Sequence, residues 1–281
     1  MFQQITILGP GLLGASIAMA IKQAHPSTRI HTWSRRVETR KKSQTADWCD
    51  QVFSTAQTAV QHSDLVILCT PVATIVPLLE DILDHLQAQA CVTDVGSTKA
   101  EICQAAHHLF SGSAAHFIGS HPMAGSAQSG MEHAQASLLK EAYCLITPMA
   151  DTPPEQVAHL VDFWRMLHMQ AQLLSPSEHD RIVAHISHLP HFLASSLAWQ
   201  LAQKPSEWTQ YCGGGLRDST RIASGDPTLW QQIFHQNKRE VLNAIDGLEQ
   251  SLASLKQALH CDNSSELYKR LEQAKNYRDQ L

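Results

Sequence analysis

The sequence lacks the marks of several large classes of protein. No stretch of its 281 residues is long and apolar enough to span a bilayer. Residues 1–4 place no basic cluster ahead of an apolar segment, so we expect no secretory signal. Aspartate and glutamate (26) outnumber lysine and arginine (21), and the formal net charge of -5 gives no reason to expect nucleic acid or an anionic membrane as a partner.

The cysteines form no pattern typical of disulfides or metal ligands. The seven cysteines are odd in number, scattered and without Cys-x-x-Cys spacing, which is typical of reduced thiols in a cytoplasmic protein. Histidine is abundant, with 17 residues, but no His-Glu-x-x-His or similar spacing occurs, so we predict no metal site. The chain is long enough for one large or two medium domains.

Strand and helix patterns alternate in the first half of the chain. This alternation predicts a mostly parallel, doubly wound sheet of the Rossmann type, an α/β fold. A proline-rich stretch at residues 148–154 is typical of a domain boundary, and one more α/β unit follows it, with a helix near 154–168. The segments predicted as strands are residues 5–8, 29–33, 64–69, 90–94, 116–120, 143–147 and 170–174.

Beyond residue 175 the pattern is helical. Apolar residues recur at three-to-four spacing from 245 to 259, and a helix of this kind cannot bury its stripe alone. We therefore expect the stripe to pack on a partner subunit as well as on its own domain, in a homodimer. The predicted division is a dinucleotide-binding domain at residues 1–174 and an all-helical substrate-binding and dimerisation domain at residues 175–281.

A glycine-rich turn links the first predicted strand to an apolar helix. Residues 9–14 read Gly-Pro-Gly-Leu-Leu-Gly, where the first glycine permits the tight turn, the second admits a pyrophosphate and the third lets helix and strand pack closely. The alternative is a turn with a structural role only. We assign cofactor binding to residues of this turn and of the strand end at residue 70, namely Gly9, Gly11, Leu12, Leu13, Gly14, Thr70 and Pro71.

The end of the second predicted strand indicates which dinucleotide binds. A free ribose 2′-hydroxyl usually meets an acidic residue about 20 residues beyond the glycines. This strand instead ends in Ser34, Arg35 and Arg36. Because arginine forks match a phosphate dianion, we predict a preference for NADP over NAD. A solvated basic turn is the alternative.

Three further segments hold polar residues suited to chemistry on a small anionic molecule. His121 follows a predicted strand and precedes a proline, which suits a general base, although a hydrogen-bonded loop histidine is an equal alternative. Three glycines at 213–215 precede Arg217 and Arg221, which could clamp carboxylates or form a solvated basic turn. The third segment contains a series of histidines that could bind an anionic, hydroxylated substrate: His179, His185, His188 and His191. Simple helix packing is the alternative, and we expect it for His185.

Taken together, these segments resemble the prephenate/arogenate (cyclohexadienyl) dehydrogenases of tyrosine biosynthesis. The similarity covers nearly the whole chain in one order. It implies oxidative decarboxylation of prephenate with hydride transfer to NADP or NAD, in a dimer, with inhibition by tyrosine left open. At this length we expect neither the chorismate mutase nor the regulatory domain that some members carry. The matching stretches are residues 9–14, 94–99, 119–125, 188–191, 216–223 and 225–230.

The resemblance also implies roles for individual residues. His121 would be the catalytic base, Ser97 would hydrogen-bond the substrate hydroxyl or His121, and Arg221 would clamp a carboxylate, with Arg217 also binding substrate. The side-chain pocket would be lined by His179, His188 and His191. One position departs from the family: many members carry a gating glutamate where this chain has Ser126-Ala127-Gln128, and this leaves gating and substrate choice open.

Several alternatives remain. A donor or cation at His191 favours the pyruvyl carboxylate of prephenate, whereas an arogenate enzyme would use an acidic partner, for which Asp180 and Glu178 are available. A β-hydroxyacid dehydrogenase would require a lysine base after the cofactor domain. Lys204 is the only lysine between residues 140 and 238, and it lies in an unsuitable turn. An NADP-binding protein without catalytic activity is the last alternative.

Overall fold

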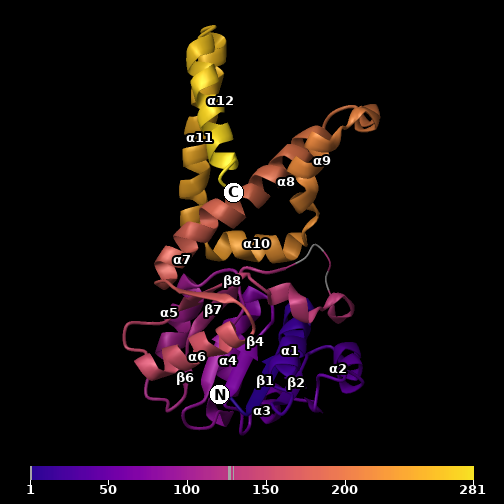
Figure 1. Cartoon of the computed structure of the whole chain (residues 1–281), viewed down its shortest axis with the longest axis vertical. Coiled ribbons are helices and arrows are strands. Elements are labelled where there is room, and N and C mark those ends of the chain that lie inside the picture. The colour runs from indigo at the N-terminus through magenta and orange to yellow at the C-terminus, as the bar shows by residue number, and fades with distance from the viewer. Residues whose placement is uncertain (1, 126–127, 129) are drawn as a thin grey trace.

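The computed structural model describes residues 2–125, 128 and 130–281. An α/β domain forms one end of the molecule, and two pairs of helices project from it as separate arms (Figure 1). The helix α10 (Pro227–Gln236) lies across the α/β domain at the base of the arms. No helix of the described residues is both long and apolar enough to cross a membrane.

The α/β domain is built on a six-stranded parallel sheet with strand order β3-β2-β1-β4-β5-β6. The apolar runs explain its centre, since every residue of β1 and β4 is buried, as expected for strands covered on both faces. The strands are β1 (Gln4–Leu8), β2 (Arg29–Trp33), β3 (Gln51–Phe53), β4 (Leu65–Leu68), β5 (Cys91–Asp94) and β6 (His116–Phe117).

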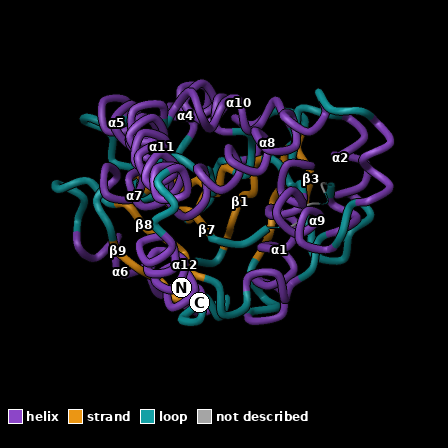
Figure 2. Tube along the Cα trace, turned by 90° about the horizontal axis from the view of Figure 1, so that it is seen from above, coloured by secondary structure: helices purple, strands orange, loops and turns teal. Residues whose placement is uncertain are grey.

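Helices cover both faces of this sheet (Figure 2). One face packs on α1 and α6 through an apolar cluster that includes Ile7, Ile17 and Trp164. The other packs on α3, α4 and α5 through a cluster that includes Leu68 and Ile102. The helices of this domain are α1 (Leu12–Ala24), α2 (Val37–Gln44), α3 (Ala56–Ala59), α4 (Ile75–Ile82), α5 (Ala100–Leu109) and α6 (Pro154–Met166), with 3₁₀ turns at Val72–Thr74, Leu83–His85, Met131–His133 and Ala136–Leu139.

A second, three-stranded sheet corrects the sequence prediction. The single strand expected at residues 116–120 is divided at Ile118, so that β6 completes the parallel sheet and β7 (Gly119–Pro122) begins a new one. There β7 pairs antiparallel with β8 (Tyr143–Thr147), which pairs in parallel with β9 (Gln170–Leu173). The structure also contains β3, which the sequence analysis missed.

The remaining helices form the arms. The helices α8 and α9 make one arm, and α11 and α12 lie side by side in the other (Figure 1). The buried cluster formed by these helices is small, centred on Ala184, Val241 and Ala244. The elements are α7 (Pro176–Val183), a π-helical turn (Ala184–His188), α8 (Leu189–Ala202), α9 (Gly214–Thr220), α11 (Lys238–His260) and α12 (Ser264–Arg278), with 3₁₀ turns at Ser206–Tyr211 and Arg221–Ser224.

Candidate active site

The glycine turn after β1 has the geometry of a dinucleotide cradle. Gly9 has a φ of 92°, and a Cβ there would lie 2.8 Å from the Cys69 carbonyl oxygen. A Cβ on Gly14 would lie 2.7 Å from the Gly9 carbonyl oxygen, whereas one on Gly11 would meet nothing within 4 Å. The first and third glycines are therefore required by the fold, and the second leaves open space at the N-terminus of α1.

Two further observations fit a dinucleotide at this turn. No side chain caps the N-terminus of α1, so its first amides, at Leu12 and Leu13, remain available to an anion. The Thr70 hydroxyl oxygen, next to Gly9 at the end of β4, is buried and has no hydrogen-bond partner within the described residues. Pro71 follows it and is exposed. A bound nicotinamide dinucleotide would accept a hydride from a substrate placed beside these strand ends.

Hydrogen bonds from Arg40 stabilise the main chain of the turn that follows β2. The Arg40 guanidinium donates to the carbonyl oxygens of Ser34 at 2.6 Å and of Arg35 at 3.1 Å. The Ser34 hydroxyl accepts from the Arg36 amide at 3.3 Å. The side chains of Arg35 and Arg36 are exposed and, as far as the structure describes the chain, make no hydrogen bond or ion pair. The sequence analysis did not single out Arg40, because its contacts are to main-chain oxygens.

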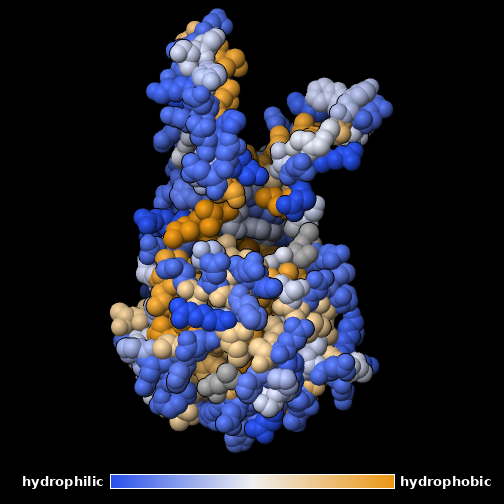
Figure 3. Space-filling model, in the orientation of Figure 1, coloured by the Kyte–Doolittle hydropathy of each residue, from blue (hydrophilic) through white to orange (hydrophobic). Residues whose placement is uncertain are grey.

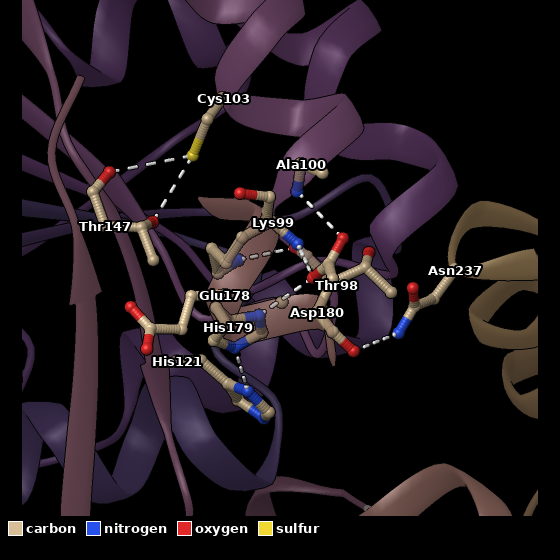
Figure 4. Close-up of polar contacts among 12 residues, drawn as sticks. Thr98, Lys99, Ala100, Cys103, His121, Thr147, Glu178, His179, Asp180 and Asn237 are labelled. Carbon is tan, nitrogen blue, oxygen red and sulfur yellow. Dashed lines mark hydrogen bonds and ion pairs between the residues drawn. The ribbon is translucent and has the colours of Figure 1, made fainter. Parts of the chain in front are cut away.

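His121 lies on β7, hydrogen-bonded in a line with two other residues (Figure 4). Its Nδ1 is 2.8 Å from His179 Nε2, and His179 Nδ1 is 2.8 Å from an Asp180 carboxylate oxygen. The Asp180 carboxylate also accepts the amides of Lys99 and Ala100 at 2.8 and 3.0 Å, and so caps the N-terminus of α5. His121 therefore has one ring nitrogen, Nε2, left for a ligand.

The chain of three residues is neutral at the histidines and anionic at the carboxylate. Burial, followed by the neighbouring His179 and Lys99, lowers the pKa of His121 well below its usual value. Burial likewise lowers the pKa of His179. Burial opposes ionisation of Asp180, but the hydrogen bond from His179 and those from the amides at the start of α5 outweigh it, so its pKa is lowered. His121 is thus an unprotonated imidazole, which is the form able to accept a proton.

A fully buried ion pair between Lys99 and Asp94 is hydrogen-bonded to β7. Lys99 Nζ lies 2.5 Å from Asp94 Oδ2, and neither side chain is exposed to solvent. The other oxygen of Asp94 accepts the amide of Ser120, the residue before His121, at 3.3 Å. Lys99 also donates to the Thr98 carbonyl at 2.8 Å. The pair therefore fixes the base relative to the carboxyl end of β5.

His188 and His191 are both buried near the start of α8. Asn237 Nδ2 donates to the Asp180 carbonyl at 2.8 Å and lies 3.2 Å from His188 Nδ1. This arrangement makes His188 Nδ1 an acceptor and leaves a proton on Nε2, which is buried without a hydrogen-bond partner among the described residues. Burial lowers the pKa of His188 to about 4. This neutral N–H has no close hydrogen-bond partner among the described residues, although the main chain of Ser97 is near enough to raise the pKa of His188 against the effect of burial.

His191 stacks on Trp230, with ring centroids 3.5 Å apart and an interplanar angle of 11°. Burial lowers the pKa of His191, so the ring is neutral at pH 7 and is not the cation that the sequence analysis considered. The stack requires Gly225, since a Cβ there would lie 2.5 Å from Trp230 Nε1. Trp230 was quoted for the family resemblance only, and its contact with His191 could not be deduced from spacing.

The other predicted residues lie at different distances from this cluster. Ser97 is half-buried between β5 and α5, and its hydroxyl makes no hydrogen bond to any residue that the structure describes. Arg217 on α9 and Arg221 just after it are exposed. His185 is exposed on the π-helical turn. Ser126 and Ala127, part of the stretch that replaces the family glutamate, lie outside the described residues.

His179 differs from its expected position. It was expected to line the substrate pocket, but it is fully buried behind His121 with both ring nitrogens in hydrogen bonds. It therefore has no ring nitrogen left for a substrate.

A glycine cradle at the carboxyl end of β1, together with a buried, unprotonated histidine on β7, is typical of a dehydrogenase that uses a nicotinamide dinucleotide. The comparisons with known proteins agree. Residues 17–173 match the prephenate dehydrogenase nucleotide-binding domain, and residues 175–273 match the prephenate dehydrogenase dimerization domain. The chain belongs to the prephenate dehydrogenase family.

Individual relatives cover most of the chain. A prephenate dehydrogenase of Lactococcus lactis subsp. cremoris is 36% identical over 254 residues, which are 89% of this chain and 69% of the relative. A cyclohexadienyl dehydrogenase of Zymomonas mobilis is 29% identical, covering 99% of this chain and 95% of the relative.

Two solved structures show the same architecture. One is the prephenate dehydrogenase of A. aeolicus in complex with hydroxyphenyl propionate and NAD+, with a TM-score of 0.93, 29% identity and coverage of 100% of this chain and 98% of the other. The other is the arogenate dehydrogenase of Synechocystis, with a TM-score of 0.85, 32% identity and coverage of 99% of both chains.

Proposed function

We propose that this protein oxidises and decarboxylates prephenate to 4-hydroxyphenylpyruvate and passes the hydride to NADP. The main support is the state of His121: an unprotonated, buried histidine whose Nδ1 is bound to His179, so that Nε2 is the nitrogen available to a substrate hydroxyl. Ser97 is proposed to hydrogen-bond the same hydroxyl from the turn between β5 and α5.

The chemistry balances with one base. A nicotinamide held at the glycine turn would accept the hydride from C4 of the ring, and His121 Nε2 would take the C4 hydroxyl proton. The resulting ketone is conjugated with the two ring double bonds, so the ring carboxylate on the opposite carbon belongs to a vinylogous β-keto acid. Loss of carbon dioxide from that carbon returns its electron pair to the ring, the C4 oxygen takes the proton back from His121, and an aromatic phenol forms. His121 is then ready for the next turnover.

Prephenate is preferred over arogenate in this proposal because the acidic groups that could hold an ammonium are engaged. Asp180 is only 3% exposed, and its carboxylate already accepts three hydrogen bonds. Glu178 is exposed and lies 3.9 Å from Arg181. The neutral donors at His188 and His191 suit a pyruvyl group without requiring an amine. A dehydrogenase acting on arogenate, or on both substrates, is the alternative.

The carboxylate clamps are proposed to come from a homodimer. Arg217 and Arg221 are exposed on the arm formed by α8 and α9, while apolar side chains lie along the arms around the gap between them (Figure 3). A second copy seated in this gap would bury that surface and bring arginines against a carboxylate of the substrate. The exposed apolar residues of the arms include Leu193, Trp199, Leu252, Leu259 and Leu271.

The preference for NADP is proposed to come from the turn after β2. The unpaired Arg35 and Arg36 side chains favour the 2′-phosphate of NADP over the hydroxyl of NAD.

Tyrosine shares the ring and side-chain skeleton of the product, and we propose that it inhibits by competing for the substrate site, which steady-state inhibition patterns would test. Seven free cysteines agree with a cytoplasmic location.

The test compares the wild-type protein with His121→Asn under prephenate and NADP, following reduced cofactor and carbon dioxide together. We expect equal amounts of both products from the wild type. The variant should lose about 10²–10⁴-fold in kcat, the usual value of a positioned base, with little change in KM. Reduced cofactor without carbon dioxide, or an active His121→Asn, would contradict the proposal.

A further inference from the structure

We propose that His179 and Asp180 are positioning residues for the base. Through two hydrogen bonds they hold His121 with its proton on Nδ1 and its lone pair on Nε2, and they share the positive charge that the base acquires. This inference rests on the proposed function of His121 as the base. It assigns to His179 a role behind His121 in place of contact with the substrate.

The protonation state of Asp180 determines that of His179, which in turn determines that of His121. The Asp180 carboxylate is ionised and can only accept, so His179 Nδ1 carries the proton of that hydrogen bond. A neutral His179 then has an unprotonated Nε2, which must accept from His121 Nδ1. A neutral His121 therefore has its lone pair on Nε2. The carboxylate thus selects the one tautomer of His121 that can receive a proton from the substrate.

The hydrogen bonds that link His121, His179 and Asp180 also stabilise the charge that forms on the base. When Nε2 takes the hydroxyl proton, a cation forms in a buried site that already contains the Lys99 ammonium. Burial opposes that cation, and so would positive charge on the neighbouring His179, Lys99 and His188, which lower the pKa of His121. Asp94 is paired with Lys99, so Asp180 is the carboxylate hydrogen-bonded to the histidines. As the His121 Nδ1 proton moves toward His179 Nε2, the positive charge moves toward Asp180 without any change of oxidation state.

Asp180 is itself held rigidly, as a positioning residue must be. Its carboxylate caps α5 through the amides of Lys99 and Ala100, and its carbonyl accepts from Asn237 at the start of α11 (Figure 4). The residue therefore ties the α/β domain to the helical part at the point where the base is oriented. An oriented partner of this kind is lost if the carboxylate moves by about 1 Å.

The experiment measures kcat, KM and the pH profile of kcat/KM for the wild type, His179→Phe, His179→Gln and Asp180→Asn. His185→Phe is the matched control, because His185 is an exposed histidine on the next turn. We expect His179→Phe to lose about 10²-fold in kcat with KM within about threefold of the wild type, since tautomer selection in a triad is worth up to about 10⁴-fold. His179→Gln, whose carbonyl can accept from His121 Nδ1, should recover about tenfold of that loss.

The Asp180→Asn variant separates positioning from structure. Removing the anion destabilises the protonated form of the base, so the acidic limb of kcat/KM should move to lower pH as kcat falls. Loss of the α5 cap alone would lower the melting temperature and leave the limb where it is. That result, or wild-type kcat in His179→Phe, would overturn the inference. An active His121→Asn would instead contradict the proposed function.

Discussion

Substitution of Arg35 or Arg36 should lower kcat/KM for NADP and leave kcat/KM for NAD unchanged. Both guanidinium groups are exposed and unpaired in the part of the chain that the structure describes, so Arg35→Ala and Arg36→Ala should leave stability within about 0.5 kcal/mol of the wild type. A charge-assisted hydrogen bond to a phosphate contributes about 1.5–3 kcal/mol, and exposure places these two at the lower end. Since about 1.4 kcal/mol is tenfold, each variant should lose about tenfold in kcat/KM for NADP.

The assay is the initial rate with each cofactor at saturating prephenate. Arg40→Ala is the matched control, because the Arg40 guanidinium is engaged with the carbonyl oxygens of Ser34 and Arg35. It should weaken both cofactors by a similar factor. An equal loss for NADP and NAD in Arg35→Ala and Arg36→Ala would refute the reasoning, as would a wild-type preference for NAD.

Three further predictions concern stability and the cofactor cradle. Lys99→Met should lower the free energy of unfolding by about 3–5 kcal/mol, because it leaves the buried Asp94 carboxylate without its ion-pair partner. The double variant Lys99→Met with Asp94→Asn should show a higher melting temperature than Lys99→Met alone. Because burial lowers the pKa of His188 to about 4, the unfolded chain binds this proton first as pH falls. His188 alone should therefore contribute a drop of about 3 kcal/mol to the free energy of unfolding between about pH 6.5 and 4, and His188→Gln should show a shallower total drop in urea titrations. Gly9→Ala should lower the melting temperature, whereas Gly11→Ala should keep it and reduce cofactor affinity measured by calorimetry.

Local patterns predicted much of the α/β domain. The apolar runs at β1 and β4 and the glycine turn between β1 and α1 are each specified within a few residues. The three-residue β3 was missed because it is short, partly exposed and has no clear alternation. The division at Ile118 was missed because the apolar pattern continues through it, and only the pairing of β7 with β8 reveals the second sheet.

The site was predicted in its parts but not in its connections. His121 was identified by its place at a strand end, but its partner His179 is 58 residues away in the sequence. Asp180 reaches the amide of Lys99 across 81 residues, and no periodic pattern encodes that cap. Burial of Lys99 could not be inferred either, because lysine is almost never fully buried unless it is paired, and its partner Asp94 was not recognised as such.

The most direct test of the account is a set of initial rates for the wild-type protein with prephenate or arogenate, each with NADP or NAD. The account predicts the highest kcat/KM with prephenate and NADP. Activity mainly with arogenate would contradict the substrate assignment drawn from His188, His191 and the engaged carboxylates. Activity mainly with NAD would contradict the role of Arg35 and Arg36, and no activity in any combination would contradict the assignment of His121 as the base of a dehydrogenase.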